Sequence, residues 1–408
     1  MNNEYTIRTR EELILALQEA AHVEHGLLLQ YLYAAFSMKQ AEAEGLQWDE
    51  MELVNTWKGD LLRIARDEMG HLGTVMNMMI AVGAYPLMQR PPFPQRTTKW
   101  FPVPFELTGF SLETVNRFVR FESPEPLHLT EFAAVAPVIP RYTYVGELYR
   151  AIRAGFLTVD SANPNLFLGR PGAEDKDTWG LHFAPRPIRS VADATMAIDA
   201  LVSQGEGTPD GSDPSAHFTT FSRIASEISE AIQKNPGFSA GRNVVNNPTL
   251  RPLGEANPAA AVIDSALPSF EMGAIHSSLY ILLLQILQVY YDPVPQEGAL
   301  RGELQTICAQ LMMLAVRPIG EILTTLPASS QSQSPRSGPS FELYGDIALS
   351  PDPLSRWTLM HERLQLAIEA ATNLAARDIP ELPPLENILL GLKAINEKID
   401  GIKGAMHA

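Results

Sequence analysis

The chain has 408 residues, a formal net charge of −16 and a hydrophobic content of 45%, which is ordinary for a soluble globular protein. This length exceeds a usual single core, so one large domain or two packed domains are expected. The negative charge argues against binding to nucleic acid and to anionic membranes. The single cysteine, Cys308, excludes an intramolecular disulfide and a multi-thiolate metal site, and it is most simply a small buried hydrophobe.

The N-terminal residues predict no signal peptide, because Met1–Tyr5 lacks a basic region followed by an apolar run. The longest apolar run, beginning at Leu279, is too short to span a bilayer. We therefore expect a cytoplasmic protein with neither a membrane partner nor a nucleic-acid partner.

Apolar periodicity predicts an all-α fold without a strand or an internal repeat. The first block of helices is expected over 8–38, 50–83, 111–121, 143–156, 190–203 and 215–234. A second block is expected over 270–291, 300–325, 355–376 and 385–402. These blocks predict a helical bundle over residues 1–234 and a C-terminal helical region over 255–408 packed on it. The Ser/Gln/Pro-rich stretch 327–339 predicts a flexible loop.

The first helix carries a carboxylate in the middle of its apolar face. Its apolar side chains recur at three- and four-residue steps, and Glu24 interrupts them. The stripe consists of Leu13, Leu17, Ala20, Glu24, Leu27, Tyr31 and Ala35. Taken alone, Glu24 is better explained by a buried ion pair with an arginine than by a metal ion.

The second helix places both a carboxylate and an imidazole on its apolar face. Glu68 and His71 belong to the stripe Trp57, Leu61, Ile64, Glu68, His71, Val75, Met78 and Val82. Burying an unpaired carboxylate costs several kcal/mol, so a compensating charge is required, and a metal ion is the simplest candidate.

The same Glu-x-x-His spacing occurs at two further places that do not predict a site. Glu19 and His22 lie off the apolar stripe of their helix, where we expect a solvated face. Glu125, which is spaced in the same way from His128, precedes Pro126, and a residue before proline disfavours the helical conformation.

The third helix begins at its N-cap, Ser111, and has Glu122 near its end on the apolar side. Three successive helices thus each carry a glutamate on the apolar face. Metal centres in four-helix bundles are built from a glutamate on each of two helices and Glu-x-x-His on the other two. The combination therefore favours a metal over separate ion pairs.

The fourth contribution is less regular. The helix over 190–203 ends in a turn that contains Glu206, and His217 begins the apolar face of the next helix. Their spacing is not i, i+3, so both bind a metal only if the intervening loop folds back. A glycine cap at Gly205 or Gly207 together with a core histidine explains the same residues, and spacing alone leaves both interpretations open.

Oxygen and nitrogen ligands suit iron or manganese better than structural zinc, and the sequence allows one or two ions. His276 and His361 lie in the second block without a carboxylate at helical spacing on a clear apolar face, so they are expected to be structural or surface histidines.

Several segments resemble the ferritin-like domain of iminophenylpyruvate dimer synthases, the enzymes of violacein-type and rebeccamycin-type bisindole pathways. The similarity covers about residues 10 to 345, and the order and spacing of the motifs make it fairly specific. The similar segments are Ala21–His25, Gln30–Ala34, Asp67–Leu72, Phe118–Glu125, Gly205–Thr208, Ala216–Phe221 and Gly338–Glu342.

The resemblance implies a ferritin-like four-helix bundle with long loops and a C-terminal helical extension. It implies an iron site with the candidate ligands Glu24, Glu68, His71, Glu122, Glu206 and His217. His25, next to Glu24, and Tyr31 are expected to surround these ligands. Bisindole synthases of this kind are much longer chains, so a stand-alone member that acts on a different substrate is expected.

The leading hypothesis is a non-haem iron oxidase or oxygenase, with a di-iron carboxylate site, that uses O₂ on a small amino-acid-derived or aromatic metabolite in natural-product biosynthesis. Oxidative coupling of two imines, as the resemblance implies, is the first alternative. A metal-binding or storage protein is the second, and an interaction module whose carboxylates form ion pairs is the third. A homo-oligomer is compatible with each of them.

Overall fold

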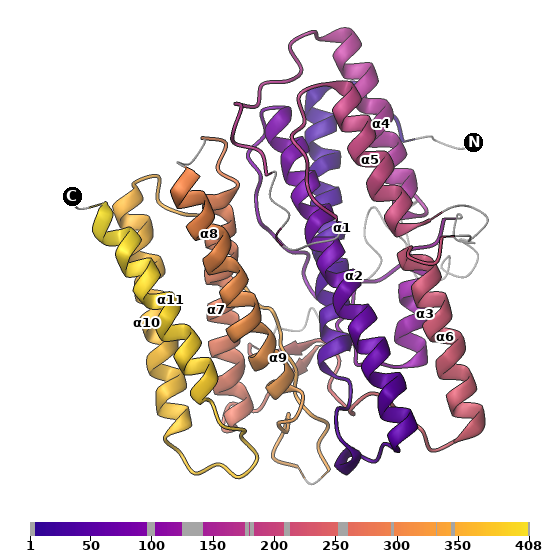
Figure 1. The fold of residues 1–408 in the computed structure, drawn as a ribbon, viewed down its shortest axis with the longest axis vertical. Helices are drawn as coiled ribbons and strands as arrows, with labels where there is room; N and C mark the ends of the chain where they lie inside the picture. The colour runs from indigo at the N-terminus through magenta and orange to yellow at the C-terminus, as the bar shows by residue number, and fades with distance from the viewer. Residues whose placement is uncertain are drawn as a thin grey trace. The chain divides into compact units, whose positions relative to one another are not determined.

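The computed structural model describes most of the chain and divides it into two compact units (Figure 1). The first unit comprises Met1–Gly241 with Pro293–Pro295, and the second comprises Arg242–Asp292 with Gln296–Ala408. The described residues are 5–95, 103–124, 142–175, 179, 183–207, 213–251, 260–294, 298–331, 333–343 and 347–406.

All six helices predicted for the first unit are present. They are α1 (Arg10–Phe36), α2 (Trp48–Ala81), α3 (Leu112–Phe121), α4 (Val145–Ala162), α5 (Val191–Gly205) and α6 (His217–Lys234), with a short 3₁₀ turn η1 (Glu42–Glu44) between the first two. Helix α4 extends past its predicted end at residue 156, because Val159 also packs into the core.

The starts of these helices follow from their capping residues. Thr9 and Glu12 form a reciprocal capping box at the start of α1, so two backbone N–H groups that lack a helical partner are satisfied. Ser111 and Ser190 accept a hydrogen bond from the third residue of α3 and α5, respectively. Ser111 is the N-cap that the sequence predicts.

Helices α1 and α2 are the longest helices of the first unit and pack along each other, with the four shorter helices beside them (Figure 1). Helix α4 packs on α1 and on α5, whereas α3 packs on α6. Helices α5 and α6 both contact α2, at different positions along it. The apolar stripes predicted for α1 and α2 are buried throughout, including their charged members. The end of α3, the end of α5 and the start of α6 lie beside Glu68 and His71 of α2.

The second unit is also helical, and the fold class predicted from the sequence is confirmed. Its helices are α7 (Pro268–Tyr290), α8 (Gly298–Leu311), α9 (Arg317–Leu323), α10 (Pro353–Ala375) and α11 (Glu386–Ala405). The single helix expected over 300–325 is interrupted by a π-helical segment, Met312–Val316. Pro318 accounts for this interruption, because proline lacks the N–H group that would continue the helical hydrogen bonds.

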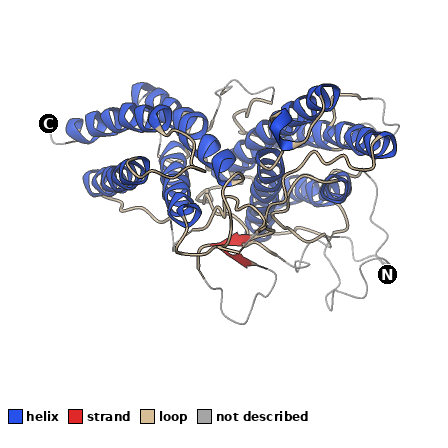
Figure 2. Cartoon of the chain, turned by 90° about the horizontal axis from the view of Figure 1, so that it is seen from below, coloured by secondary structure: helices blue, strands red, loops and turns tan. Residues whose placement is uncertain are grey.

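The expectation that the chain has no strand was wrong, because the structure contains a small two-stranded sheet. β1 (Pro248–Thr249) and β2 (Ala261–Val262) pair in parallel, and Figure 2 shows them as the red arrows. Two-residue strands have too short a sequence pattern to be detected by periodicity. Glu342 accepts a hydrogen bond from the backbone N–H of Leu250, which follows β1, and thereby holds this segment.

Two helical stretches of the second unit are long and apolar enough to cross a bilayer by length and composition, contrary to the expectation from the longest uninterrupted apolar run. They are Pro268–Tyr290 and Leu300–Leu323. In the first, 83% of the apolar window is buried within the protein, compared with 44% in the second. The first is therefore the core helix of its unit.

The stretch 327–339, which the sequence predicts to be flexible, makes backbone hydrogen bonds. Ala328 N donates to Pro335 O, and Ser337 N donates to Leu326 O. Flexibility of this stretch stays a prediction.

His276 predicts acid sensitivity of the second unit. It is buried in α7 with its ring against Phe341, and burial lowers its pKa to about 3. Below about pH 6.5 the unfolded chain binds a proton at this residue and the folded chain does not. Stability is therefore lost as the pH falls from about 6.5 towards 3, by up to about 1.4 kcal/mol per pH unit. We expect His276→Gln to flatten this limb in denaturant titrations at pH 4 to 7, and parallel curves for the two proteins would contradict the assignment.

Candidate metal centre

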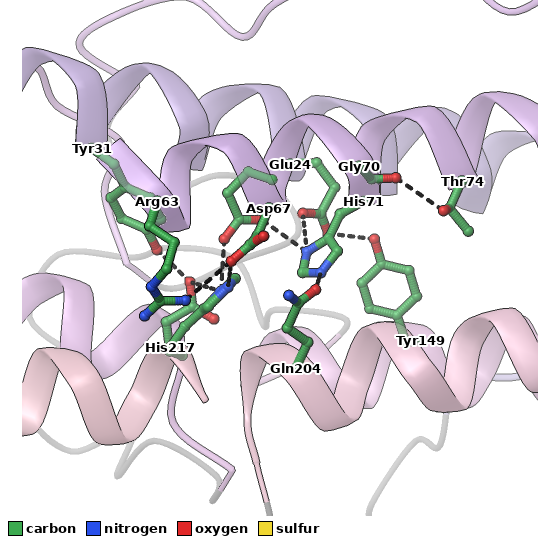
Figure 3. Close-up of polar contacts among 12 residues, drawn as sticks. Glu24, Tyr31, Arg63, Asp67, Gly70, His71, Thr74, Tyr149, Gln204 and His217 are labelled. Carbon is green, nitrogen blue, oxygen red and sulfur yellow. Dashed lines mark hydrogen bonds and ion pairs between the residues drawn. The ribbon is translucent and has the colours of Figure 1, made fainter. Parts of the chain in front are cut away.

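Three ionisable side chains meet in the middle of the α1–α2 pair. Glu24, Glu68 and His71 are all buried, and one donor atom from each lies within 4.8 Å of the others. His71 Nδ1 lies 2.9 Å from Glu68 Oε2 and 3.4 Å from Glu24 Oε2. His71 Nε2 donates to the side-chain oxygen of Gln204 at 2.9 Å, and this leaves Nδ1 directed at the two carboxylates (Figure 3).

A second group shares one carboxylate with the first. Glu68, Glu122 and His217 again place their donor atoms within 4.8 Å of one another, and all three are buried. His217 Nδ1 lies 3.0 Å from Glu68 Oε1 and 3.8 Å from Glu122 Oε1. The two oxygens of Glu68 therefore face two different histidines, so Glu68 belongs to both donor groups.

The positions of these residues in their helices explain why their sequence spacing is irregular. Glu122 is the C-cap of α3, and His217 is the first residue of α6. Both lie at helix ends, where the chain leaves or enters the bundle beside the long pair. A residue at a helix end does not need an i+3 partner on its own helix, so among the two donor groups the Glu-x-x-His spacing is found only at Glu68 and His71 of α2.

Glu206 lies beside the same cavity but outside both groups of donor atoms. It is the C-cap of α5 and is buried, and Gly207 follows it with a positive φ of 74°. The cavity has a volume of about 20 Å³, which exceeds the roughly 10–15 Å³ needed for one water molecule. Its lining consists of Glu24, Leu27, Glu68, His71, Phe121, Glu122, Val145, Gly146, Tyr149, Leu201, Val202, Gly205 and Glu206.

The pKa values of the buried carboxylates and imidazoles show that ionised carboxylates are costly here without a positive charge beside them. Burial raises the pKa of Glu24 to about 8 and that of Glu206 to about 7. For Glu68 burial opposes ionisation, but the two imidazoles outweigh it and lower the pKa of the carboxyl group. Burial is likewise outweighed at His71 and His217, where the carboxylates, chiefly Glu68, raise the pKa of His71 to about 10 and that of His217 well above its usual value. Protons thus supply the positive charge that a metal ion would supply.

Several donor atoms are left without a hydrogen bond, which fits a cation. Glu68 Oε1, Glu206 Oε1 and both ring nitrogens of His217 are buried and have no hydrogen-bond partner of acceptable geometry. Glu68 Oε1 and His217 Nδ1 are close but poorly aligned for a hydrogen bond. Unpaired buried donors and acceptors are costly, and coordination of one ion by several of them would remove that cost. The residues present therefore fit a carboxylate-rich metal site.

Two tyrosines complete the hydrogen bonding of the terminal carboxylates. Tyr31 donates its hydroxyl hydrogen to Glu122 Oε1 at 2.5 Å, and Tyr149 donates to Glu24 Oε1. Burial and the adjacent carboxylates raise the pKa of both phenols well above their usual value, so both remain donors. Tyr31 is a predicted neighbour of the ligands. Tyr149 is not predicted, because nothing in α4 distinguishes it from an ordinary core aromatic residue.

Asp67 and Gln204 are further polar neighbours that the sequence pattern did not single out. Asp67 Oδ2 lies 3.5 Å from His217 Nε2, and it accepts a hydrogen bond from Arg63 at 3.2 Å (Figure 3). Such outer contacts orient metal-binding imidazoles. Asp67 adjoins the Glu-x-x-His motif, and that adjacency was the available signal.

The remaining predicted positions divide as follows. His25 is buried, and its Nδ1 lies 2.9 Å from the carbonyl oxygen of Gln89, so its role beside Glu24 stays a prediction. The expectation of a solvated face for Glu19 and His22 was wrong, since both are half-buried beside the loops that cover α1. The pair Glu125 and His128 lies outside the described residues.

A helical bundle with two buried carboxylate-histidine groups in its interior has the architecture of a carboxylate-type metalloprotein. The family model described as "Ferritin-like" matches residues 17–226, and the chain belongs to this family. The ferritin-like domain that the resemblance implies is thereby confirmed.

Two curated relatives are similar over most of this chain. Dichlorochromopyrrolate synthase from Lentzea aerocolonigenes is 28% identical over 85% of the chain and 37% of its own length. The 2-imino-3-(indol-3-yl)propanoate dimerase from Chromobacterium violaceum is 26% identical over 92% of the chain and 38% of its own length. The chain thus spans less than two-fifths of either relative.

Among solved structures, a ferritin-like protein from Caulobacter vibrioides is similar at 19% identity with a TM-score of 0.47, covering 74% of this chain and 96% of that one.

Proposed function

We propose that this protein is an enzyme of natural-product biosynthesis that uses a non-haem iron centre to oxidise or oxygenate a small amino-acid-derived or aromatic metabolite. The observation that carries the proposal is the sharing of Glu68 by two buried donor groups, Glu24/Glu68/His71 and Glu68/Glu122/His217. Carboxylate-dominated sites with one imidazole per ion suit iron or manganese.

The residues of this chain have distinct tasks in the proposal. Glu68 would be shared by the two donor groups, while Glu24 and Glu122 would each hold a metal ion in one of them. His71 and His217 supply the nitrogen ligands, each oriented through its other ring nitrogen by Gln204 or Asp67. Tyr149 and Tyr31 hold the terminal carboxylates by hydrogen bonds, and Phe121 and Leu27 restrict water at the cavity.

When bound, iron would supply the electrons that reduce O₂. The cavity of about 20 Å³ accommodates a molecule of the size of water or O₂ and is too small for an aromatic metabolite. The organic substrate in this proposal is therefore bound outside the described cavity. A cytoplasmic location, O₂ as co-substrate and assembly into a homo-oligomer belong to the proposal as well.

Oxidative coupling of two amino-acid-derived imines is a second candidate. The names of both curated relatives favour it, because one is a dimerase of an indolyl iminopropanoate and the other is a synthase. Because the chain spans less than two-fifths of either relative, we rank this candidate behind oxidation or oxygenation of a single metabolite.

The test is metal content and oxygen consumption. Protein purified aerobically is expected to contain about one or two iron ions per chain. After removal of iron and anaerobic reloading with Fe(II), exposure to O₂ is expected to consume the gas in proportion to the iron. Folded protein that binds no iron would support the interaction module and contradict the proposal. Iron in large excess within a particle of many subunits would support storage instead.

A further inference from the structure

Gly146 occupies a position at which any side chain would collide with a residue that lines the cavity, Glu206. It lies in the first turn of α4 and is buried. A Cβ atom added there would overlap Glu206 Oε1 and lie 2.6 Å from Glu206 Oε2. The nearest atoms are thus the carboxylate of a single residue, and the helix backbone does not itself require a glycine at this place.

Glu206 has features that a metal-binding side chain would show. Its Oε1 is buried and has no hydrogen-bond partner of acceptable geometry, and the carboxylate lines the same cavity as Glu24 and Glu68. It is the C-cap of α5, so its backbone is not constrained by helix on both sides. Gly205, the preceding residue, is the second glycine at the cavity, and a Cβ there would lie 3.2 Å from Glu122 Oε2.

We infer that Gly146 is a positioning residue of the metal centre, because the space left by its missing side chain is the space in which the Glu206 carboxylate stands at the edge of the cavity. From this position Glu206 would be available as a sixth donor at the cavity that Glu24, Glu68 and His71 also line. The inference rests on the proposed metal site. It assigns to α4 a role in metal binding although no residue of α4 is itself a ligand.

A double-mutant cycle tests the inference with Mn²⁺ as the probe. The proteins are the wild type, Gly146→Ala, Glu206→Ala and the double variant, with Mn²⁺ affinity measured by titration calorimetry and thermal unfolding measured on the metal-free proteins. Gly59→Ala in α2 is the matched control, because a Cβ there meets nothing within 4 Å. Gly205→Ala provides an intermediate case.

We expect Gly146→Ala to weaken Mn²⁺ binding about 10- to 100-fold, the range of changes in outer contacts of a metal site. Glu206→Ala weakens it as well. In the Glu206→Ala background the additional Gly146→Ala change is expected to alter affinity less than about twofold, since the group that it displaces is gone. In that background it also raises the unfolding temperature, because alanine is the better helix former.

Each other outcome is decisive. Wild-type affinity in Gly146→Ala overturns the inference and leaves the proposed function intact. An equal loss of affinity in both backgrounds shows that Gly146 acts through helix packing, which also overturns it. If Gly146→Ala fails to fold while the double variant folds, the clash with Glu206 is supported. If the wild type binds no Mn²⁺ at all, the proposed function fails first, and the inference falls with it.

Discussion

Glu68→Ala is expected to lose most of the bound metal and to weaken metal binding more than any other single ligand substitution. Glu68 is the only described residue that belongs to both donor groups, so its removal affects both ion positions at once. The loss of affinity should exceed the roughly 10- to 100-fold effect of changes in outer contacts. The measurement is metal content by elemental analysis after gel filtration, together with Mn²⁺ titration.

The same substitution is expected to destabilise the metal-free protein. Glu68 is the negative partner of both His71 and His217, and removal of one partner from a buried ion pair costs about 3–5 kcal/mol. Glu19→Ala is the matched control, because Glu19 begins the same Glu-x-x-His pattern and is only half-buried. It should retain its metal. Full metal occupancy in Glu68→Ala, or equal losses in the two variants, would contradict the assignment of Glu68 as the shared ligand.

Gly70→Ala is the second substitution with a large expected effect. Gly70 lies in α2 between Glu68 and His71, and a Cβ there would lie 2.5 Å from the backbone carbonyl oxygen of Phe183. Backbone cannot turn aside as a flexible side chain does, so the segment at Phe183 or the helix must shift. Overpacking of this kind costs about 1–3 kcal/mol. Because the Phe183 ring also packs edge-on against His71 at 4.9 Å, the shift should disturb that ligand.

Gly59→Ala in the same helix separates this clash from helix propensity. Gly59 is exposed and a Cβ there meets no other atom within 4 Å, so the substitution should stabilise by about 0.5–1 kcal/mol. The free energies of unfolding from urea titrations of the metal-free proteins should therefore change in opposite directions. Equal changes in the two variants would show that the carbonyl group at Phe183 moves away without cost.

The fold was largely predictable because the helices of this chain are long and amphipathic. The predicted stripes of α1 and α2 are buried along their whole length, and their periodicity identified Glu24, Glu68 and His71 as core-facing groups. Periodicity is a local property, so it works best where a helix buries one continuous face. In the shorter α3 an apolar residue is a weaker guide to burial, since Leu112 and Val119 are only half-buried whereas Phe118 is fully buried.

The parts that the sequence did not determine depend on contacts between distant segments. Glu206 approaches the cavity from the end of α5, and His217 approaches Glu68 from the start of α6. Their separation along the chain carries no sign of this. Tyr149 and Gln204 become relevant only because α4 and α5 place them against Glu24 and His71. The glycine at position 146 likewise acquires meaning only beside Glu206.

The most direct test of the central claim is anomalous X-ray scattering from crystals soaked in Mn²⁺. The account predicts anomalous density at the cavity, in contact with Glu68 and with Glu24/His71, Glu122/His217 or both groups. A cavity without anomalous density at saturating Mn²⁺, in which Glu68 remains paired with the two imidazoles, would contradict it.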